Sequence, residues 1–291
     1  MFARFIFTVF ALIAAPLQAQ TPTEALGGTI ARLEAQMQAR IGVQLLDTAT
    51  GWGWSHRPDE RFIMASTFKS LLCGGILHGV DRGEIRLEEK LKIGAAVPRN
   101  SPVTSRYLGG SLTIARLCFA TLNQSDNGAA NLLIDRLGGP DGLTEFLRSI
   151  GDEVTRLDRK EPEMNIFVPG DPRDTTSPAA MVATWQKLLV GEVLTPASQA
   201  QLIEWMSTGT ATAPLLRPAV PKGWHVADRS GGGRDHTRNI VAMLTPPGRA
   251  PLFVAIFVSD TPANWSARNA AVTELSAAAL AVLKGQVEAP Q

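Results

Sequence analysis

Ser66 and Lys69 are the first pair of side chains in the sequence that could act together as a nucleophile and its base. They stand three positions apart at the start of a predicted helix, so their side chains would share one face. A serine hydroxyl becomes a nucleophile when a base removes its proton, and a lysine can be that base when burial or nearby cations lower its pKa. A helix N-terminus would also favour a developing oxyanion. Taken alone, this spacing is more often an N-cap serine followed by a surface lysine.

Two further short motifs follow in the chain. Ser125-Asp-Asn127 precedes a helical run, and Arg229-Ser-Gly231 ends a predicted strand and is followed by Gly232 and Gly233. Each has an ordinary structural explanation, because Ser, Asp and Asn are common N-cap residues and a strand often ends in a glycine turn. The ordered set of three motifs is much more specific than any one of them.

Helices and strands must bring these distant motifs together. Hydrophobic spacing predicts strands over 41–47, 51–55, 224–230, 240–244 and 252–258. It predicts helices over 23–39, 66–79, 112–122, 127–137, 141–150, 177–190, 198–206 and 263–284.

Strands therefore lie at both ends of the chain, with helices between them. This order predicts an α/β (α+β) fold with a mainly antiparallel sheet, flanking terminal helices and an inserted all-α lobe. We expect one domain over 20–291, with an α/β lobe over about 20–62 and 208–291 and a helical lobe over about 63–207.

Composition excludes several function classes. The 291 residues carry 28 basic and 27 acidic side chains, so nothing points to nucleic acid. The two cysteines stand far apart, and the four histidines form no H-x-H or H-x-x-x-H pair. We therefore expect neither a metal nor a cofactor.

Residues 1–19 have the pattern of a secretory signal peptide, with Arg4, an apolar run and a small-residue cleavage site ending at Ala19. Export would place Cys73 and Cys118 in an oxidising compartment, where a disulfide is expected and two buried free thiols are the alternative. Such a bridge is worth about 4 kcal/mol in the chain-entropy model.

The ordered motifs resemble those of the class A serine β-lactamases. Other segments are similar to that family as well, over about residues 24–284: 101–104, 159–165, 170–176, 189–195 and 268–269, together with the positions of the two cysteines. The resemblance implies the two-lobed fold that β-lactamases share with penicillin-binding proteins.

The resemblance also implies roles for individual residues. Ser66 would be the acylated nucleophile, with Lys69 as its proton partner. Ser125 would pass a proton to the leaving lactam nitrogen, and Glu161 would activate the hydrolytic water. The residues implied to bind substrate or to hold that water are Asn127, Asn165, Arg229, Ser230, Gly231, Gly232 and Arg238.

Two further implied arrangements concern backbone groups and an ion pair. The N–H groups of Ser66 and Gly232 would form an oxyanion hole. Arg159 and Asp174 would pair across the neck of the omega loop and keep Glu161 near the water.

The third motif departs from the common family pattern, because Arg229 stands where lysine is usual. Arginine binds a carboxylate with a fixed two-pronged geometry and stays charged. R-S-G resembles the carbenicillin-hydrolysing subgroup, and Arg238 matches the family's second carboxylate-binding cation. The two cations predict a site suited to penicillins, including carboxypenicillins.

Two other departures concern the substrate entrance. Asn100 stands where many relatives have an aromatic residue, so that wall is missing or is supplied by another residue. Ala65 replaces the cysteine found beside the nucleophile in several serine carbapenemases, which makes carbapenem hydrolysis less expected.

The expected function is hydrolysis of penicillins and some cephalosporins by a periplasmic monomer, free of the membrane after signal cleavage. A penicillin-binding transpeptidase or carboxypeptidase is the nearest alternative, and Glu161 argues against it. A non-catalytic β-lactam sensor is the alternative from another class. Class C β-lactamases and esterases are excluded by the missing Y-x-N and G-x-S-x-G motifs.

Overall fold

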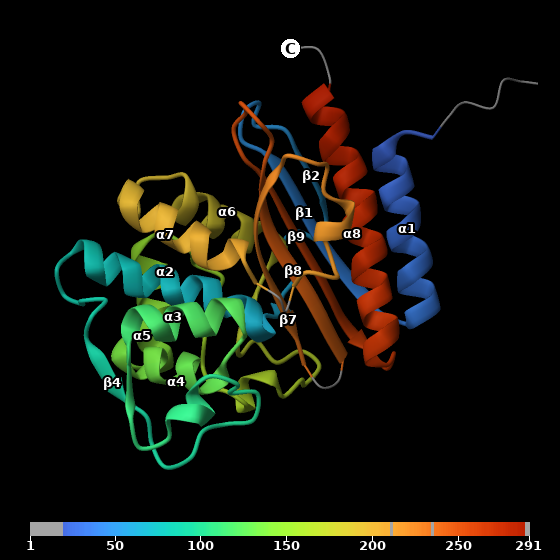
Figure 1. Ribbon diagram of the computed structural model, residues 1–291. Coiled ribbons are helices and arrows are strands. Elements are labelled where there is room, and N and C mark those ends of the chain that lie inside the picture. The colour runs from blue at the N-terminus through green and yellow to red at the C-terminus, as the bar shows by residue number, and fades with distance from the viewer. Residues whose placement is uncertain (1–19, 210–211, 234–235, 289–291) are drawn as a thin grey trace, which may run out of the picture.

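The computed structural model describes residues 20–209, 212–233 and 236–288. The predicted signal peptide over 1–19 lies outside these residues. Within them, five antiparallel strands form the main sheet in the order β2-β1-β9-β8-β7 (Figure 1). Their bounds are β1 (Arg40–Asp47), β2 (Gly53–His56), β7 (His225–Gly232), β8 (His236–Thr245) and β9 (Leu252–Thr261). The predicted antiparallel sheet built from both ends of the chain is confirmed.

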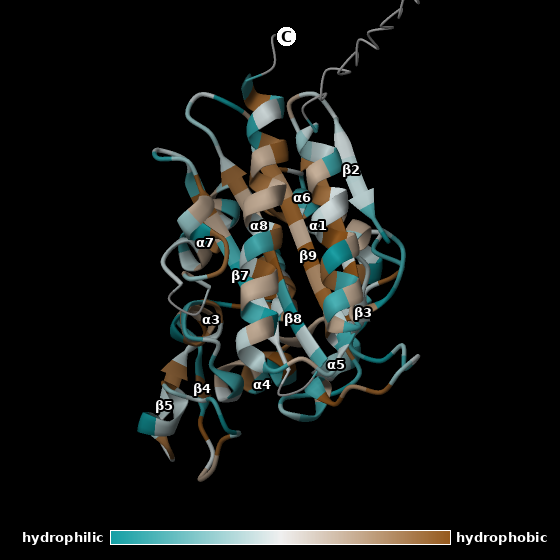
Figure 2. Cartoon of the chain, turned by 90° about the vertical axis from the view of Figure 1, so that its right-hand side faces the viewer, coloured by the Kyte–Doolittle hydropathy of each residue, from teal (hydrophilic) through white to brown (hydrophobic). Residues whose placement is uncertain are grey.

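Two terminal helices cover one face of this sheet. They are α1 (Pro22–Met37) and α8 (Trp265–Glu288), which lie side by side over the strands (Figures 1 and 2). Thr21 begins α1 with a capping box, in which Thr21 and Glu24 satisfy each other's backbone N–H groups. By length and composition α8 is the one described helix that could cross a membrane, and its Val272, Leu275 and Leu283 are buried against the sheet.

The central strands are buried on both faces. Along β9, Phe253, Ala255 and Phe257 belong to the core shared with the inserted helices, whereas Val254 and Ile256 belong to the core under the terminal helices. Successive side chains of a strand point to opposite faces, so a strand between two cores is apolar throughout. This explains the continuous hydrophobic run of this segment in the sequence.

The inserted lobe consists mainly of six helices, all on the other side of the sheet (Figure 1). They are α2 (Phe68–Asp81), α3 (Ile114–Asn123), α4 (Asn127–Arg136), α5 (Gly139–Ser149), α6 (Pro178–Leu189) and α7 (Pro196–Ser207). Four of them begin at a side-chain N-cap: Thr113, Asp126, Ser177 and Thr195. The six helices predicted for this lobe are confirmed to within a few residues at each end.

Several short elements left no readable pattern in the sequence. They are the pair β3 (Phe62–Ile63) and β6 (Thr175–Thr176), the pair β4 (Lys90–Lys92) and β5 (Ser111–Thr113), and 3₁₀ turns at Ala65–Thr67, Thr104–Tyr107, Glu163–Asn165 and Arg217–Ala219. Two or three residues are too few to show a period. The pair β3–β6 matters for the site. It joins the end of the segment 159–176, which carries Glu161 and is called the omega loop in the family that the sequence resembles, to the residues just before Ser66.

The predicted disulfide is corrected by the structure, in which Cys73 and Cys118 are buried free thiols. Helices α2 and α3 do bring them together, and the Cys73 Sγ lies 3.9 Å from the Cys118 carbonyl oxygen. Burial raises the pKa of the Cys118 thiol well above its usual value, so the thiol is neutral at neutral pH. The two side chains pack as small hydrophobic groups, which is the alternative that the sequence left open.

Candidate active site

One open cleft of about 880 Å³ separates the helical lobe from the edge strand β7. The residues that line it come from widely separated parts of the chain. They include Ser66, Ser125, Asn127, Glu161, Asn165, Arg229, Ser230, Gly232 and Arg238. The fold therefore brings nine of the residues singled out in the sequence to a single cavity.

Ser66 lies in the 3₁₀ turn just before α2 rather than in the α-helix itself, which begins two residues later. The Asn239 side chain holds this turn from below, because its Nδ2 donates to the carbonyl oxygens of Ile63 and Met64 at 2.9 and 3.1 Å. Strand β7 approaches from the side at Gly231. A Cβ there would lie 2.6 Å from the Met64 oxygen and 3.0 Å from the Ser66 nitrogen, so only glycine allows this approach.

Lys69 is fully buried beneath Ser66, and the surface-lysine explanation is therefore wrong. Its Nζ lies 2.6 Å from Asn127 Oδ1, 3.3 Å from Ser125 Oγ and 3.2 Å from Glu161 Oε1. Burial lowers the pKa of Lys69 to about 8, the Arg229 cation adds to this, and the Glu161 carboxylate opposes it. At neutral pH about a tenth of such an amine is unprotonated.

Ser125 connects Ser66 to the two buried cations. Its hydroxyl donates to Ser66 Oγ at 3.1 Å and accepts from Arg229 Nη2 at 2.5 Å. Its backbone is left-handed, with φ at 58°, a conformation that is costly for a serine and that surrounding contacts must hold. The neighbouring Asp126 does the capping that the sequence suggested for this motif, because its Oδ1 accepts from the N–H of Ala129 at the start of α4.

Glu161 lines the cleft and is itself buried. Its Oε2 accepts from Asn165 Nδ2 at 2.5 Å, whereas its Oε1 faces Lys69 and accepts no hydrogen bond from the described residues. The Asn131 side chain holds the Glu161 backbone on both sides, at 2.9 Å to its N–H and 2.8 Å to its carbonyl oxygen. Sequence reasoning missed Asn131, although it follows Asn127 by four positions and so lies on the same helix face.

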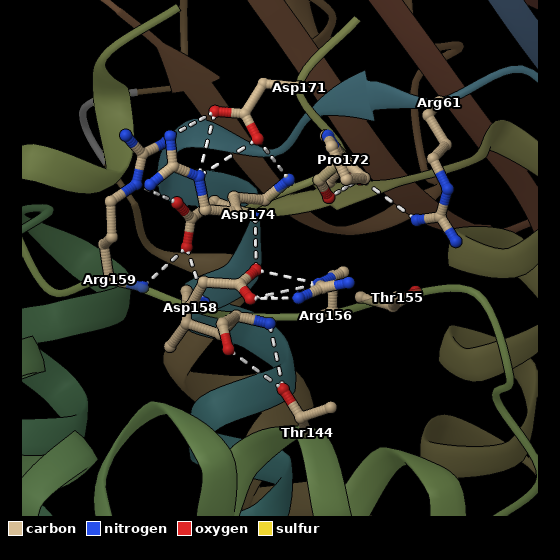
Figure 3. A network of polar contacts seen from close by, with 12 residues as sticks. Arg61, Thr144, Thr155, Arg156, Asp158, Arg159, Asp171, Pro172 and Asp174 are labelled. Carbon is tan, nitrogen blue, oxygen red and sulfur yellow. Dashed lines mark hydrogen bonds and ion pairs between the residues drawn. The ribbon is translucent and has the colours of Figure 1, made fainter.

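The segment that carries Glu161 is closed at its neck by reciprocal contacts (Figure 3). Asp174 accepts from the N–H groups of Asp158 and Arg159 at 2.7 and 2.9 Å, and from Arg159 Nε at 2.6 Å. The Asp158 carboxylate in turn accepts from the Asp174 N–H at 2.9 Å. The Asp174 carbonyl oxygen also accepts from the Met64 N–H at 2.9 Å, which couples the neck to the turn of Ser66.

Replacing Asp174 by alanine should lower the free energy of unfolding by about 2–4 kcal/mol, because Arg159 and two backbone N–H groups lose their acceptor. Turnover should fall as well, since the neck holds Glu161 in the cleft. Urea denaturation and steady-state kinetics would measure both effects. Glu84→Ala is the matched control, because it breaks an exposed pair with Arg82 and should change stability by less than about 0.5 kcal/mol. Equal stability losses in the two variants would contradict the prediction.

Two cations stand at the β7 side of the cleft. Arg229 is fully buried, and its Nε and Nη1 have no hydrogen-bond partner within the described part of the chain. Burial lowers its pKa to about 10, so it remains charged at neutral pH. Arg238 donates from Nε to Asn269 Oδ1 at 2.7 Å and from Nη1 to the Gly231 oxygen at 3.0 Å. These contacts leave Arg229 as the cation with more unused donors.

The described residues offer no metal centre. Among residues 20–209, 212–233 and 236–288, no three His, Cys, Asp or Glu side chains are grouped so that they could hold a metal ion. The polar side chains that line the cleft carry hydroxyl, amide, carboxylate and guanidinium groups, and the Lys69 amine lies beneath them.

Comparisons with known proteins agree with this geometry. The model of the family described as "Beta-lactamase enzyme family" matches residues 25–283. A β-lactamase of Rhodobacter capsulatus is 48% identical over 268 residues, which are 91% of each chain. The crystal structure of a β-lactamase from Xanthomonas campestris is 44% identical, with a TM-score of 0.87 over 90% of this chain and 98% of that one. An ancestral class A β-lactamase is 47% identical, with a TM-score of 0.84 over 87% of this chain and 98% of that one. On this combined evidence of site, fold and sequence, the chain belongs to the class A β-lactamases.

Proposed function

We propose that this β-lactamase hydrolyses the lactam amide of penicillins, including carboxypenicillins, and of some cephalosporins, and so gives antibiotic resistance. The observation that carries the proposal is one chain of close contacts. Ser66 Oγ contacts Ser125 Oγ at 3.1 Å, Ser125 Oγ contacts Lys69 Nζ at 3.3 Å, and Lys69 Nζ contacts Glu161 Oε1 at 3.2 Å. Protons can pass between nucleophile, leaving group and base along such a chain.

In the acylation step, the Ser66 oxygen bonds to the lactam carbonyl carbon and its proton passes to a base. Lys69 is suited to this role because its lowered pKa leaves part of it neutral, and Glu161 could serve instead through a water molecule. The C–N bond then breaks, and Ser125 gives its proton to the lactam nitrogen. The N–H groups of Ser66 and Gly232 would stabilise the oxyanion, and the tight approach of Gly231 to Ser66 supports their pairing.

In the deacylation step, Glu161 takes a proton from water as the water oxygen bonds to the ester carbonyl carbon. The bond from that carbon to Ser66 Oγ then breaks, and the proton returns to Ser66 Oγ, which releases the hydrolysed product. Two buried acceptors support this role of Glu161: its Oε1, which forms an ion pair with Lys69 at 3.2 Å, and Asn165 Oδ1, which has no hydrogen-bond partner among the described residues. A single water could donate to both of them. A penicillin-binding transpeptidase lacks such a carboxylate, and that alternative is not favoured.

Arg229, Ser230 and Arg238 would bind the substrate carboxylate, with Asn127 holding the side-chain amide. We expect Arg229→Ala to lower kcat/KM for benzylpenicillin and carbenicillin by about 10- to 100-fold, because a buried, partly unpaired guanidinium is lost. Arg229→Lys should recover much of the loss, since it keeps the charge. Steady-state kinetics of both variants would test this, and equal losses would refute a carboxylate clamp.

We also propose that the chain is a periplasmic monomer after its signal peptide is removed.

The direct test of the proposed function uses the chain from residue 20 onward, purified after export. Benzylpenicillin, carbenicillin and a chromogenic cephalosporin should each be hydrolysed over many turnovers, and the ratio of the two penicillins tests the carbenicillin-hydrolysing subgroup. A single stoichiometric burst that then stops would contradict the proposal and would indicate a penicillin-binding enzyme or a β-lactam sensor.

A further inference from the structure

Trp265, the first residue of α8, lines the same cleft as Ser66 and is 46% exposed. It was not among the residues that the sequence singled out. A single exposed apolar side chain is ordinary on a protein surface. This one differs because its ring borders the cavity that holds the candidate nucleophile.

Three neighbours hold the indole in place. The Arg238 guanidinium lies 4.6 Å from its ring centroid, and the Arg268 guanidinium lies 5.5 Å away. On the strand side, a Cβ at Gly232 would lie only 2.7 Å from the Cζ3 and Cη2 atoms of the ring. Real Cβ contacts are never that short, so the indole occupies the space that a side chain at position 232 would need.

This placement puts an aromatic face beside the cations of the cleft. Arg238 contacts the ring, and Gly232 lies three residues from Arg229 on the same strand. A ligand whose carboxylate meets Arg238, the cleft cation that contacts the indole, would bring its adjacent ring next to Trp265. Asn100, which stands where many relatives have an aromatic residue, lines the cleft from the helical lobe.

We propose that Trp265 is a specificity-determining residue whose indole forms the apolar wall for the carboxylate-bearing ring of the substrate. While the indole stays in this position, the packing leaves no room for a side chain at position 232. The inference rests on the proposed function, because it assigns the place of part of that function's substrate. Trp265 itself transfers no proton and forms no covalent bond in the reaction.

The first experiment compares steady-state kinetics of Trp265→Ala and Trp265→Phe with the parent on benzylpenicillin. We expect Trp265→Ala to raise KM by about 3- to 10-fold with little change in kcat. The reason is that an aromatic contact stabilises the bound substrate and the bound transition state to the same extent. Trp265→Phe should recover most of the loss. Trp54→Ala is the control, because Trp54 lies on β2 at the opposite edge of the sheet and should leave KM unchanged. An unchanged KM in Trp265→Ala would overturn the proposal.

The second experiment is a double-mutant cycle with Gly232→Ala. In the parent, the new Cβ must displace the indole, so KM should rise. In the Trp265→Ala background only the milder 3.2 Å contact with Arg238 Cδ remains, and Gly232→Ala should raise KM by a smaller factor. Additive effects would show that the two residues act independently, which would overturn the packing argument.

The two levels of the inference can fail separately. If the parent does not turn over any β-lactam, the proposed function fails. If the parent turns over benzylpenicillin while Trp265→Ala keeps the parent's KM, only the role of Trp265 fails. Thermal unfolding of each variant separates loss of binding from loss of fold, because the proposal expects KM to change in a variant that remains folded at the assay temperature.

Discussion

Replacing Ser66 by alanine should lower kcat for every β-lactam by about 10⁴-fold or more, the largest effect expected of any single substitution in this chain. The hydroxyl is the atom that would bond to the lactam carbon, and it sits at the end of the proton path through Ser125. The cleft and its cations would remain, so only weak binding and residual hydrolysis should survive. Hydrolysis of a chromogenic cephalosporin is the measurement.

Ser149→Ala provides the control for this substitution. Ser149 lies at the end of α5, donates to the Phe146 carbonyl oxygen and does not line the cleft. It should keep the turnover of the parent. If Ser66→Ala hydrolysed the cephalosporin at a rate near that of Ser149→Ala, Ser66 could not be the nucleophile.

Replacing Glu161 by alanine should trap a penicilloyl adduct on Ser66. Loss of a general base slows the step it serves by about 10²- to 10⁴-fold, whereas acylation can continue through Lys69. Mass spectrometry of the protein after brief exposure to benzylpenicillin would detect the adduct, and peptide mapping would locate it. Glu163→Ala is the matched control, because Glu163 is exposed two positions further on and should leave turnover unchanged. Rapid turnover without an adduct in Glu161→Ala would count against its role.

The same variant predicts a shift in pH dependence. Burial and the Arg229 cation lower the pKa of Lys69, and the Glu161 carboxylate raises it. Together they bring this pKa to about 8. Removing the carboxylate should move this pKa below about 8. If neutral Lys69 is the base, the acylation rate in Glu161→Ala should rise with pH and level off above that lower pKa. Stopped-flow acylation at several pH values would measure it, and a midpoint at or above 8 would disagree with Lys69 as the base.

The secondary structure was largely readable because it depends on local periodicity. The predicted strand 252–258 is apolar at every position, and the structure explains this by two cores on its two faces. Some boundaries were less predictable: β8 begins at His236 rather than at 240, because residues 236–239 are polar and show no hydrophobic pattern, although Arg238 among them lines the cleft. The two-residue ladder β3–β6 gave no pattern at all.

The tertiary structure corrected or added details at the site that no local pattern contains. Cys73 and Cys118 are neighbours, as expected, and yet remain thiols in a packed core. Asn131 reaches Glu161 across thirty positions, and Trp265 reaches Gly232 across thirty-three. These contacts depend on how the elements pack, which side-chain types alone do not determine.

The order of the three motifs, the kinds of reactive side chains and the sheet made from both chain ends could all be predicted from the residues. The environment of each reactive group depends on how distant elements pack together. The motifs predict a base at Lys69 and a carboxylate-binding cation at Arg229, and the fold adds that both side chains are fully buried. Burial from several directions at once changes the pKa of each group and leaves unused donors facing a cleft. The physical reason is that periodicity records which face of an element is covered, whereas desolvation and close contact depend on elements far apart in the chain.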